Sequence, residues 1–364
     1  MSSYAKIRKI TFRFVFFIII ATFFSCFQSG KGEDCKPLYA FYYPWYGTPE
    51  VSGEWKHWNI DEHNPDKIEN GKRDIASVRH PYPDVYDSSS EETIRRHIEL
   101  ARRAKITGFI FSWWGKGSFE DYVLERFAEI TREENFPFSI YYEGLFKSFD
   151  EAITEIDSDL LYLSRYFQYP NYIKIDGKPA LFLYGRSLFP QFWCLQEKCP
   201  PEPPPKIDWS VIIPKWQISF VADDISFFNS FNFRDKIVEM GFRAVHAYNP
   251  YFESYFIRKI TDISEYEKIF RDYLDDAKVR NMWVGLTILP GYDDRKLKRQ
   301  IVWELPRNDG ETLIKLYEFA SKTSADAILL VSFNEWHEGT EVEPSQEFGD
   351  FYIKLLSELR KNCK

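Results

Sequence analysis

Eight short runs of apolar residues recur along the chain, and amphipathic segments separate them. The runs are rich in β-branched and aromatic residues, and they begin roughly 30–50 residues apart, the scale of one strand–helix unit. They span residues 37–45, 108–114, 136–144, 179–185, 216–223, 242–248, 282–291 and 327–336. Apolar strands that alternate with helices predict a parallel sheet covered by helices. Eight such units predict one closed (β/α)₈ TIM barrel.

The segments between the runs carry helical periodicity. Residues 88–106 repeat apolar side chains at helical spacing, and Ser89 stands three residues before Glu92, which predicts a capping box. Further helices are expected over residues 119–134, 263–279 and 310–323. Because no glycine-rich phosphate-binding motif follows the early strands, an open nucleotide-binding sheet is disfavoured.

Polar and aromatic residues stand at the C-terminal end of every predicted strand. They are Trp45, Tyr46, Trp113, Trp114, Tyr142, Glu143, Tyr184, Arg186, Asp223, Asp224, His246, Tyr248, Tyr292, Asp293 and residues 335–338. In a barrel these ends meet at one mouth, where active sites are built. Repeated Trp and Tyr at such positions favour a ligand site over ordinary polar strand ends, and we expect the active site there.

Composition narrows the class of ligand. Aromatic residues make up 18% of the 364 residues, more than a core requires, and flat rings can stack on a ligand. The formal net charge is −8, and no basic patch stands out that would neutralise phosphates. A nucleic-acid partner is therefore not expected.

Residues 1–34 have the pattern of a targeting segment. Four basic residues precede the apolar run 14–24, which is too short to span a bilayer comfortably. Cys26 directly after Ser25 suggests a lipoprotein, with plain secretion or a retained anchor as the alternatives. We expect an exported, monomeric protein with a catalytic barrel over residues 35–364, either secreted or attached to a membrane through this segment.

The cysteines are consistent with export. Cys194 and Cys199, with four residues between them, stand beside the proline-rich stretch 200–205. This spacing predicts a short local disulfide. Cys35 and Cys363 lie near the ends of the predicted barrel and can also pair, although their spacing alone does not show it. Neither pair has the surroundings of a metal site.

The strongest chemical signal is SFNEWHEGTEVEP, residues 332–344. Glu335 and Glu338 follow the last strand, so a turn there can aim both carboxylates into the mouth of the barrel. Aromatic walls with two carboxylates suit a sugar site, because glycosidic cleavage uses two such groups with different pKa values. Asn334 is expected to hold a sugar hydroxyl, and Trp336 or His337 to shield and orient. Glu341 and Glu343 are expected on a solvated loop face.

Three other chemistries fit this stretch poorly. A zinc protease needs a second histidine where this chain has Glu341, four residues after His337. The spacing of a calcium loop and the G-x-S-x-G motif of serine hydrolases are also absent from the chain. No metal and no cofactor are therefore expected.

Several stretches, in order, resemble glycoside hydrolase family 99, the endo-α-1,2-mannosidases and endomannanases. They are FYYPWYG (41–47), HW (57–58), residues 86–89, FSWW (111–114), YYEG (141–144), LPGYDD (289–294) and residues 332–344. The resemblance covers residues 36–360, and the SFNEWHEGT block is its most specific part. It implies a (β/α)₈ barrel that cleaves inside α-mannan or a mannose-containing oligosaccharide with net retention and without a metal.

The resemblance also implies roles for individual residues. Glu335 would assist the sugar 2-hydroxyl in attacking C1 to give a 1,2-anhydro sugar, and Glu338 would act as general acid and then as general base. The implied substrate-binding residues are Tyr46, His57, Trp58, Trp113, Glu143, Tyr248, Tyr292 and Asn334, to which the position of Trp336 adds a ninth.

The chain departs from the family in places that shape the outer subsites. Gly-Leu follows Glu143 where Pro-Tyr is usual, and the loops after the fourth and seventh strands match no family feature. Two other functions stay open: a non-catalytic sugar-binding barrel, which the presence of both glutamates disfavours, and a glycan-processing transferase, which these residues do not separate from a hydrolase.

Overall fold

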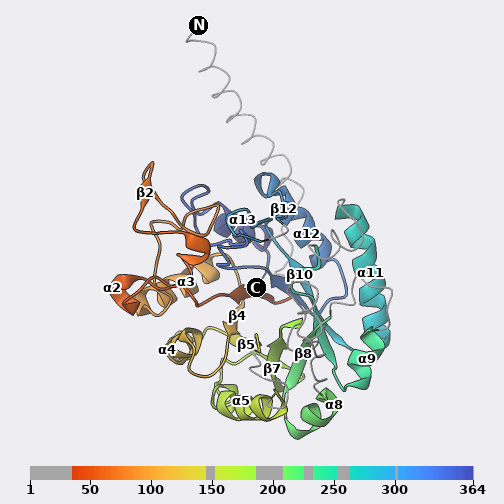
Figure 1. Ribbon diagram of the computed structural model, residues 1–364. Coiled ribbons are helices and arrows are strands. Elements are labelled where there is room, and N and C mark those ends of the chain that lie inside the picture. The colour runs from red at the N-terminus through yellow and green to blue at the C-terminus, as the bar shows by residue number, and fades with distance from the viewer. Residues whose placement is uncertain are drawn as a thin grey trace. The chain divides into compact units, whose positions relative to one another are not determined.

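All eight predicted runs form strands of one closed barrel (Figure 1). The computed structural model describes residues 35–144, 152–185, 208–224, 233–251, 263–299 and 302–363. The barrel strands are β1 (Leu38–Tyr42), β4 (Gly108–Trp113), β5 (Phe138–Tyr142), β7 (Lys178–Leu183), β8 (Ser219–Asp223), β9 (Ala244–His246), β10 (Trp283–Ile288) and β13 (Ala327–Leu330). Each lies within its predicted run, except that β7 begins one residue earlier, so the strand predictions are confirmed.

The strands pair in parallel, each with its neighbours in the sequence, and the last strand pairs with the first. Leu38 of β1 pairs with Ile328 of β13, and Gly285 of β10 pairs with Ala327 of β13. β5 pairs with β7, and β6 (Lys174–Ile175) adds a short antiparallel partner to β7. The sheet has no open edge among the barrel strands, which confirms the (β/α)₈ fold.

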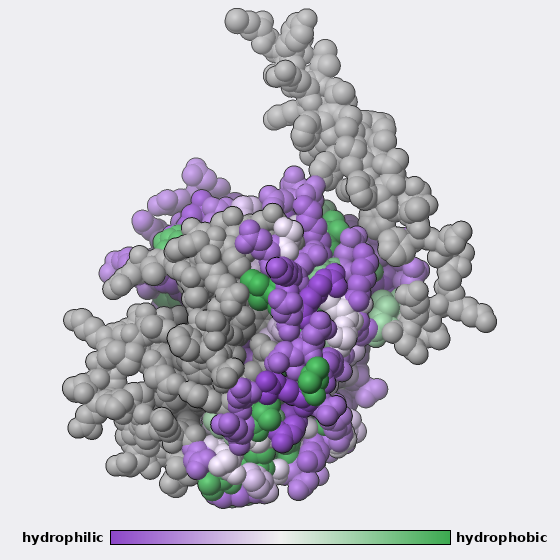
Figure 2. Space-filling view, turned by 90° about the vertical axis from the view of Figure 1, so that its right-hand side faces the viewer, coloured by the Kyte–Doolittle hydropathy of each residue, from purple (hydrophilic) through white to green (hydrophobic). Residues whose placement is uncertain are grey.

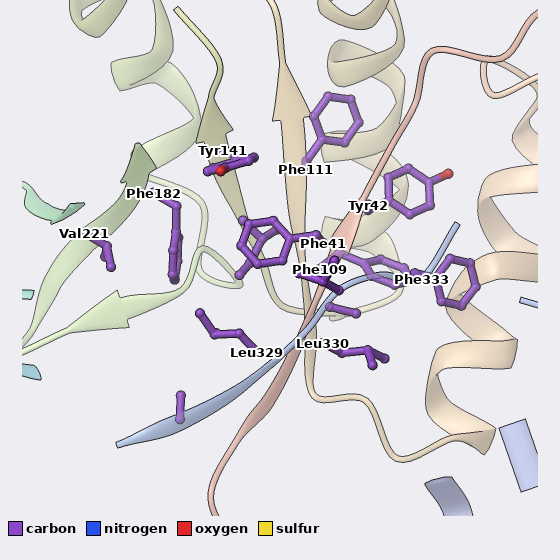
Figure 3. Close-up of a cluster of buried hydrophobic side chains, with 14 of the residues drawn as sticks. Phe41, Tyr42, Phe109, Phe111, Tyr141, Phe182, Val221, Leu329, Leu330 and Phe333 are labelled. Carbon is purple, nitrogen blue, oxygen red and sulfur yellow. The ribbon is translucent and has the colours of Figure 1, made fainter. Parts of the chain in front are cut away.

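Apolar and aromatic side chains fill both faces of the strands (Figure 3). Phe41 lies 4.8 Å from Tyr141 and 6.4 Å from Phe182 between ring centroids, both edge to face, and these rings fill the barrel. The next residue, Tyr42, points the other way and packs 5.1 Å from Phe127 of the surrounding helices. Burial on both faces explains why the strands are continuous apolar runs rather than alternating ones.

Helices surround the barrel. They are α3 (Glu91–Arg103), α4 (Phe119–Glu133), α5 (Ala152–Phe167), α8 (Trp209–Ile212), α9 (Phe233–Glu239), α11 (Ile263–Val279), α12 (Glu311–Ser321) and α13 (Phe351–Leu359). The predicted capping box is wrong. The N-cap of α3 is Ser90, whose side chain makes no capping bond, and the Ser89 hydroxyl instead donates to Asp87 at 2.5 Å.

Two longer excursions follow the C-terminal ends of β1 and β10. The first carries α2 (Pro49–Ser52), the 3₁₀ turn η2 (Ile60–Glu62) and the hairpin of β2 (Ile68–Glu69) with β3 (Lys72–Arg73). The second carries β11 (Tyr292–Asp293), β12 (Glu304–Leu305) and η6 (Asn308–Gly310). Both begin at the barrel mouth and contribute residues to the site described below.

Cys35 and Cys363 form a disulfide with their Cα atoms 5.3 Å apart, so the pairing that spacing left open is present. The barrel, residues 36–359, forms one compact unit. Cys26, Cys194 and Cys199 lie outside the described residues.

Within the described ranges, no helix has the length and apolar character needed to cross a membrane.

The described surface carries mainly polar side chains. Figure 2 shows hydrophilic residues over much of the coloured surface of one face, with hydrophobic ones scattered among them. Among the described residues, no group of three or more His, Cys, Asp or Glu side chains is arranged to hold a metal ion.

Candidate active site

The loop after β13 folds back on itself through its own backbone. The Ser332 hydroxyl accepts the Glu335 N–H at 2.7 Å, and the Thr340 N–H donates to the Glu335 carbonyl at 3.2 Å. Gly339 closes the turn with φ +60°, and a Cβ at this position would meet Arg79 and the Asp293 backbone. Only glycine fits such a position without strain. The turn thereby presents residues 335–338 at the barrel mouth.

Glu335 is buried and has one carboxylate oxygen free. It is 2% exposed, and its Oε1 accepts the His337 N–H at 3.0 Å. Its Oε2 has no hydrogen-bond partner among the described residues. Burial, and next the charge of Glu338, raise the pKa of Glu335 well above its usual value, while Arg299 opposes the rise. Glu335 therefore holds a proton more readily than an ordinary glutamate does.

Glu338 lies beside Glu335 and is paired with a base. Both terminal nitrogens of Arg299 donate to its Oε1 at 3.1 Å, whereas its Oε2 has no partner in the described part of the chain. The Glu338 carbonyl accepts the Asp293 N–H at 2.7 Å, which ties the turn to the strand after β10. In this structure the charges place the proton of the pair on Glu335, although the family resemblance implies that Glu338 is the acid.

Tyrosines from three strands face the two glutamates. The Tyr43 hydroxyl donates to the Tyr248 hydroxyl at 2.5 Å, and the Tyr248 ring stacks on Tyr141 with centroids 5.8 Å apart. Burial first, and then nearby tyrosines and carboxylates, raise the pKa values of all three hydroxyls well above the usual value. All three stay protonated, and since Tyr43 already donates to Tyr248, the hydroxyls of Tyr141 and Tyr248 are the ones that can donate to a sugar oxygen.

Two neutral histidines stack against a tryptophan on the other side. The rings of Trp45 and His57 are nearly parallel with centroids 4.5 Å apart, and His337 lies 5.6 Å from His57. His337 donates from Nε2 to the His57 carbonyl at 2.9 Å. Burial lowers the pKa of His57 to about 4 and that of His337 to about 3, so both rings are uncharged at neutral pH.

Glu143, at the end of β5, is a third buried carboxylate of the mouth. Its Oε1 accepts the Ser112 hydroxyl at 2.8 Å, and Ser112 in turn accepts the Trp114 Nε1–H at 2.9 Å. The charge of Glu143 contributes to the raised pKa values of Tyr43, Tyr141 and Tyr248. The structure thus brings Glu143 and Tyr248, both predicted substrate-binding residues, into one cluster with Glu335 and Glu338.

Other predicted binding residues lie beneath this cluster. Five are fully buried: Tyr46, Trp58, Trp113, Asn334 and Trp336. The Asn334 amide is engaged on both sides, donating to the Tyr43 carbonyl at 2.9 Å and accepting the Tyr43 N–H at 2.8 Å. Trp58 donates to the Tyr86 carbonyl at 2.9 Å. Through these hydrogen bonds Asn334 and Trp58 orient the neighbouring backbone. Tyr292, also buried, accepts from Arg299 at 2.7 Å.

The expectation of a solvated face for Glu341 and Glu343 is wrong. Glu341 is 1% exposed and pairs with Arg79 at 2.5 Å and with Arg307 at 2.9 Å. Glu343 is 3% exposed and pairs with His97 and Arg96. These bases lower the pKa of Glu343 against the effect of burial. The outer glutamates hold the loop in the protein.

Sequence reasoning missed Arg299 and Tyr43 as members of the site. Arg299 lies in a loop that matches no family feature, and nothing in the sequence places it beside Glu338. Tyr43 lies inside the FYYPWYG stretch, but sequence alone does not separate the tyrosines that face the mouth from those that face the helices. His337, between the two glutamates, was expected at the site, and the structure places it there.

Buried polar atoms without partners gather around the two glutamates. In the described residues they include Trp45 Nε1, His57 Nδ1, Tyr141 OH, Glu335 Oε2 and Glu338 Oε2. Buried polar groups are nearly always hydrogen-bonded, so such a cluster is typical of a site that binds a polar ligand. The mixture of donors, acceptors and flat rings suits a molecule with many hydroxyl groups.

Comparison with known families gives two matches. A family model described as Glycosyl hydrolase family 99 matches residues 35–203. A second, described as Glycosyltransferase WbsX, matches residues 147–356 and so includes the loop after β13.

Known proteins agree with the first match. Glycoprotein endo-α-1,2-mannosidase of Mus musculus is 23% identical over 335 residues, which cover 84% of this chain and 67% of the mouse protein. Glycoprotein endo-α-1,2-mannosidase-like protein of Homo sapiens is 22% identical over 84% of this chain and 68% of its own. The solved GH99 endo-α-mannosidase from Bacteroides thetaiotaomicron shares the fold with a TM-score of 0.66 at 22% identity, over 89% of this chain and 98% of that one.

Proposed function

We propose that this chain, which belongs to glycoside hydrolase family 99 and across residues 147–356 also to the family described as Glycosyltransferase WbsX, hydrolyses internal α-mannosidic bonds. The single observation that carries the proposal is the pair of buried glutamates, each with one unbonded oxygen, within a ring of neutral tyrosines and histidines. The substrate class, an α-1,2-linked mannoside, is taken from the relatives, whose names describe endo-α-1,2-mannosidases.

The proposed reaction proceeds with net retention. Glu335 takes the proton of the 2-hydroxyl, whose oxygen bonds to C1 while the bond from C1 to the leaving oxygen breaks. Glu338 gives its proton to that leaving oxygen. Water then attacks C1 of the 1,2-anhydro sugar and loses a proton to Glu338, while the bond from C1 to the 2-oxygen breaks and that oxygen regains a proton from Glu335. Both carboxyl groups thereby return to their starting states, as a catalytic cycle requires.

Glu335 must be ionised, and Glu338 protonated, when the first step begins. In this structure burial and the charge of Glu338 raise the pKa of Glu335, and Arg299 pairs with Glu338, so the resting proton is favoured on Glu335. One proton must therefore move from Glu335 to Glu338 before the glycosidic bond breaks. Glycosidases commonly keep two carboxyl groups with separated pKa values for such exchange.

Transfer to an acceptor sugar is the second candidate function. It is favoured by the match of residues 147–356 to a model described as Glycosyltransferase WbsX, since that region includes Glu335 and Glu338. A sugar hydroxyl would then take the place of the attacking water at C1.

We also propose that the protein is exported. The basic and apolar pattern of residues 1–34 supports this, as does the Cys35–Cys363 disulfide, since disulfides persist mainly in oxidising compartments. Mass determination of the N-terminal peptide of the mature protein distinguishes cleavage, lipidation at Cys26 and retention. An intact N-terminus on a protein recovered from the cytoplasm would contradict the proposal.

The decisive experiment is digestion of α-mannans and of α-1,2- and α-1,6-linked manno-oligosaccharides in H₂¹⁸O. Hydrolysis places ¹⁸O at the new reducing end of internal fragments, whereas transfer yields longer oligosaccharides without the label. Proton NMR of the first product gives the anomer, and retention predicts α. Intact substrates after prolonged digestion would refute the proposed function.

A further inference from the structure

Resting on the proposed function, we propose that Arg299 is a positioning residue: it holds Oε1 of Glu338 so that Oε2 exchanges the proton, and its charge sets the upper pH limit of activity. Arg299 is not among the residues that the family resemblance assigns to the site. Its place beside the second glutamate is visible only in the structure.

The guanidinium of Arg299 is fixed by groups from two segments. Its two terminal nitrogens donate to Glu338 Oε1 at 3.1 Å, and Nη1 also donates to the Tyr292 hydroxyl at 2.7 Å and to Asp294 at 3.2 Å. Asp294 is fully buried and accepts the Trp303 N–H with its other oxygen at 3.0 Å. Charge-assisted bonds with several fixed partners hold a side chain in one orientation.

This arrangement divides the two oxygens of Glu338 between two tasks. Oε1 accepts both donors of Arg299, while Oε2 has no partner among the described residues. A proton on Oε1 would meet the N–H groups of the guanidinium, so a protonated Glu338 carries its hydrogen on Oε2. The free oxygen is therefore the one that can protonate the leaving group.

The charged and titratable groups that face Glu338 come from three sides. Glu335 lies on the same turn, Tyr248 follows β9, and Tyr292 with Arg299 follows β10. The two tyrosine hydroxyls are neutral, which leaves Glu335 and Arg299 as the groups with opposite effects. Arg299 is in turn offset by Asp294, at 3.2 Å. The charges of Arg299 and Asp294 together thus set the local electrostatic field at the Glu338 carboxylate.

The segment offers a matched control. Lys298 precedes Arg299 and carries the same charge, but its ammonium group pairs with Glu62, and its side chain is 58% exposed. Replacing either residue by glutamine removes one positive charge from the same loop. Only Arg299 touches Glu338, so only its loss is expected to alter the proton transfer.

The test is the pH profile of kcat/KM on an α-mannoside for Arg299→Gln, Arg299→Lys, Asp294→Asn and Lys298→Gln. We expect Arg299→Gln to move the upper limb of the profile to higher pH by about one unit or more, the usual effect of one adjacent charge. Asp294→Asn, which leaves Arg299 unopposed, is expected to move it the other way. Arg299→Lys and Lys298→Gln should leave the limb in place.

A second measurement makes the inference independent of catalysis. ¹³C-labelled glutamate gives a carboxyl resonance for Glu338 that is identified by its loss in Glu338→Gln. We expect its midpoint to rise in Arg299→Gln and to fall in Asp294→Asn. If the midpoint and the limb do not move, Arg299 is only a structural ion pair and the proposal is wrong. If the midpoint moves as expected but no α-mannoside is cleaved, the proposed function fails while the effect of Arg299 on Glu338 stands.

Discussion

Arg79 and Glu341 form an ion pair at 2.5 Å that is buried on both sides, with 11% and 1% of the two side chains exposed. Arg307 adds a second base to the same carboxylate at 2.9 Å. Arg79 also donates to the Gly339 carbonyl, as does Arg307 at 3.0 Å. The pair thereby fixes both ends of the short stretch that follows Glu338.

The first prediction is that Glu341→Gln strongly destabilises the barrel. Removing one partner of a buried ion pair leaves the other charges uncompensated, which typically costs about 3–5 kcal/mol. Urea denaturation measures the change in the free energy of unfolding. Glu69→Gln is the control, because Glu69 pairs with Lys67 on the surface with 71% and 63% exposure, and such pairs contribute about 1 kcal/mol or less. Equal effects of the two substitutions would show that the buried pair is not structural.

The second prediction separates Glu335 from Glu338. A substrate with a very acidic leaving group needs little protonation, so Glu338→Gln should spare its cleavage far more than that of a mannan. Glu335→Gln should be severe on both substrates, because the 2-hydroxyl attacks in both. The loss should fall mainly on kcat rather than KM.

Two results would count against this division of roles. Equal losses for both variants on both substrates would remove its support. A trappable ester between Glu335 and the sugar would favour direct attack by the carboxylate instead of a 1,2-anhydro intermediate.

The third prediction concerns pH and Asp159 of α5. Burial raises the pKa of Asp159 to about 6, although the Tyr142 hydroxyl that donates to it at 2.9 Å opposes the rise. Because the folded value exceeds the unfolded value of about 3.9, this group stabilises the fold fully below about pH 4 and loses that contribution as the pH rises through about 6. Asp159→Asn should therefore be more stable than the wild type at pH 7, by about 1 kcal/mol after solvent screening, and lose this advantage near pH 4.

For Asp157, two residues earlier, the pKa shift and the resulting dependence of stability on pH have the opposite direction. Hydrogen bonds from Lys215 and Trp216 lower its pKa, so its contribution is present at neutral pH and lost as the pH falls. Asp157→Asn should lower Tm at pH 7 and have less effect in acid. Tm measured from pH 4 to pH 7 for both variants tests the pair, and a parallel response of the two would contradict it.

The fourth prediction concerns the disulfide of Cys35 with Cys363. Peptide mapping without reductant should recover the two cysteines in one linked fragment. The bridge closes a loop with a sequence separation of 328 residues, for which the chain-entropy model gives about 6 kcal/mol. Cys35→Ser with Cys363→Ser should lower Tm clearly. Cys194→Ser with Cys199→Ser is the control, since so short a predicted loop contributes at most about 2 kcal/mol.

The strands of the barrel could be predicted from the sequence because each is apolar on both faces. Phe41 fills the barrel, and the next residue, Tyr42, packs against the helices. Successive apolar residues of this kind indicate a strand that is buried on both faces. The helix start at Ser90 could not be placed, since Asp87 competes for the hydroxyl of Ser89. Local competition of this kind is common among Ser and Asp residues near helix ends.

The site was only partly predictable because its partners are distant in the sequence. Four glutamates stand close together in the SFNEWHEGTEVEP stretch, and nothing local shows which two are buried in ion pairs. The bases that pair with Glu341 and Glu343 are Arg79, Arg96, His97 and Arg307, which come from other segments. Trp58 and Trp113 were likewise expected to bind substrate, but tertiary packing buries both.

The four glutamates of the loop after β13 have two different roles. Glu335 and Glu338 each keep an unbonded oxygen, whereas Glu341 and Glu343 are enclosed by bases. The two pairs are therefore under different evolutionary constraints. A descendant that exchanged Glu335 and Glu338 for glutamine would keep its fold and nearly all of this stretch, so overall similarity would still group it with active enzymes. The residue types at those two positions alone would distinguish a catalytically active enzyme from an inactive homologue.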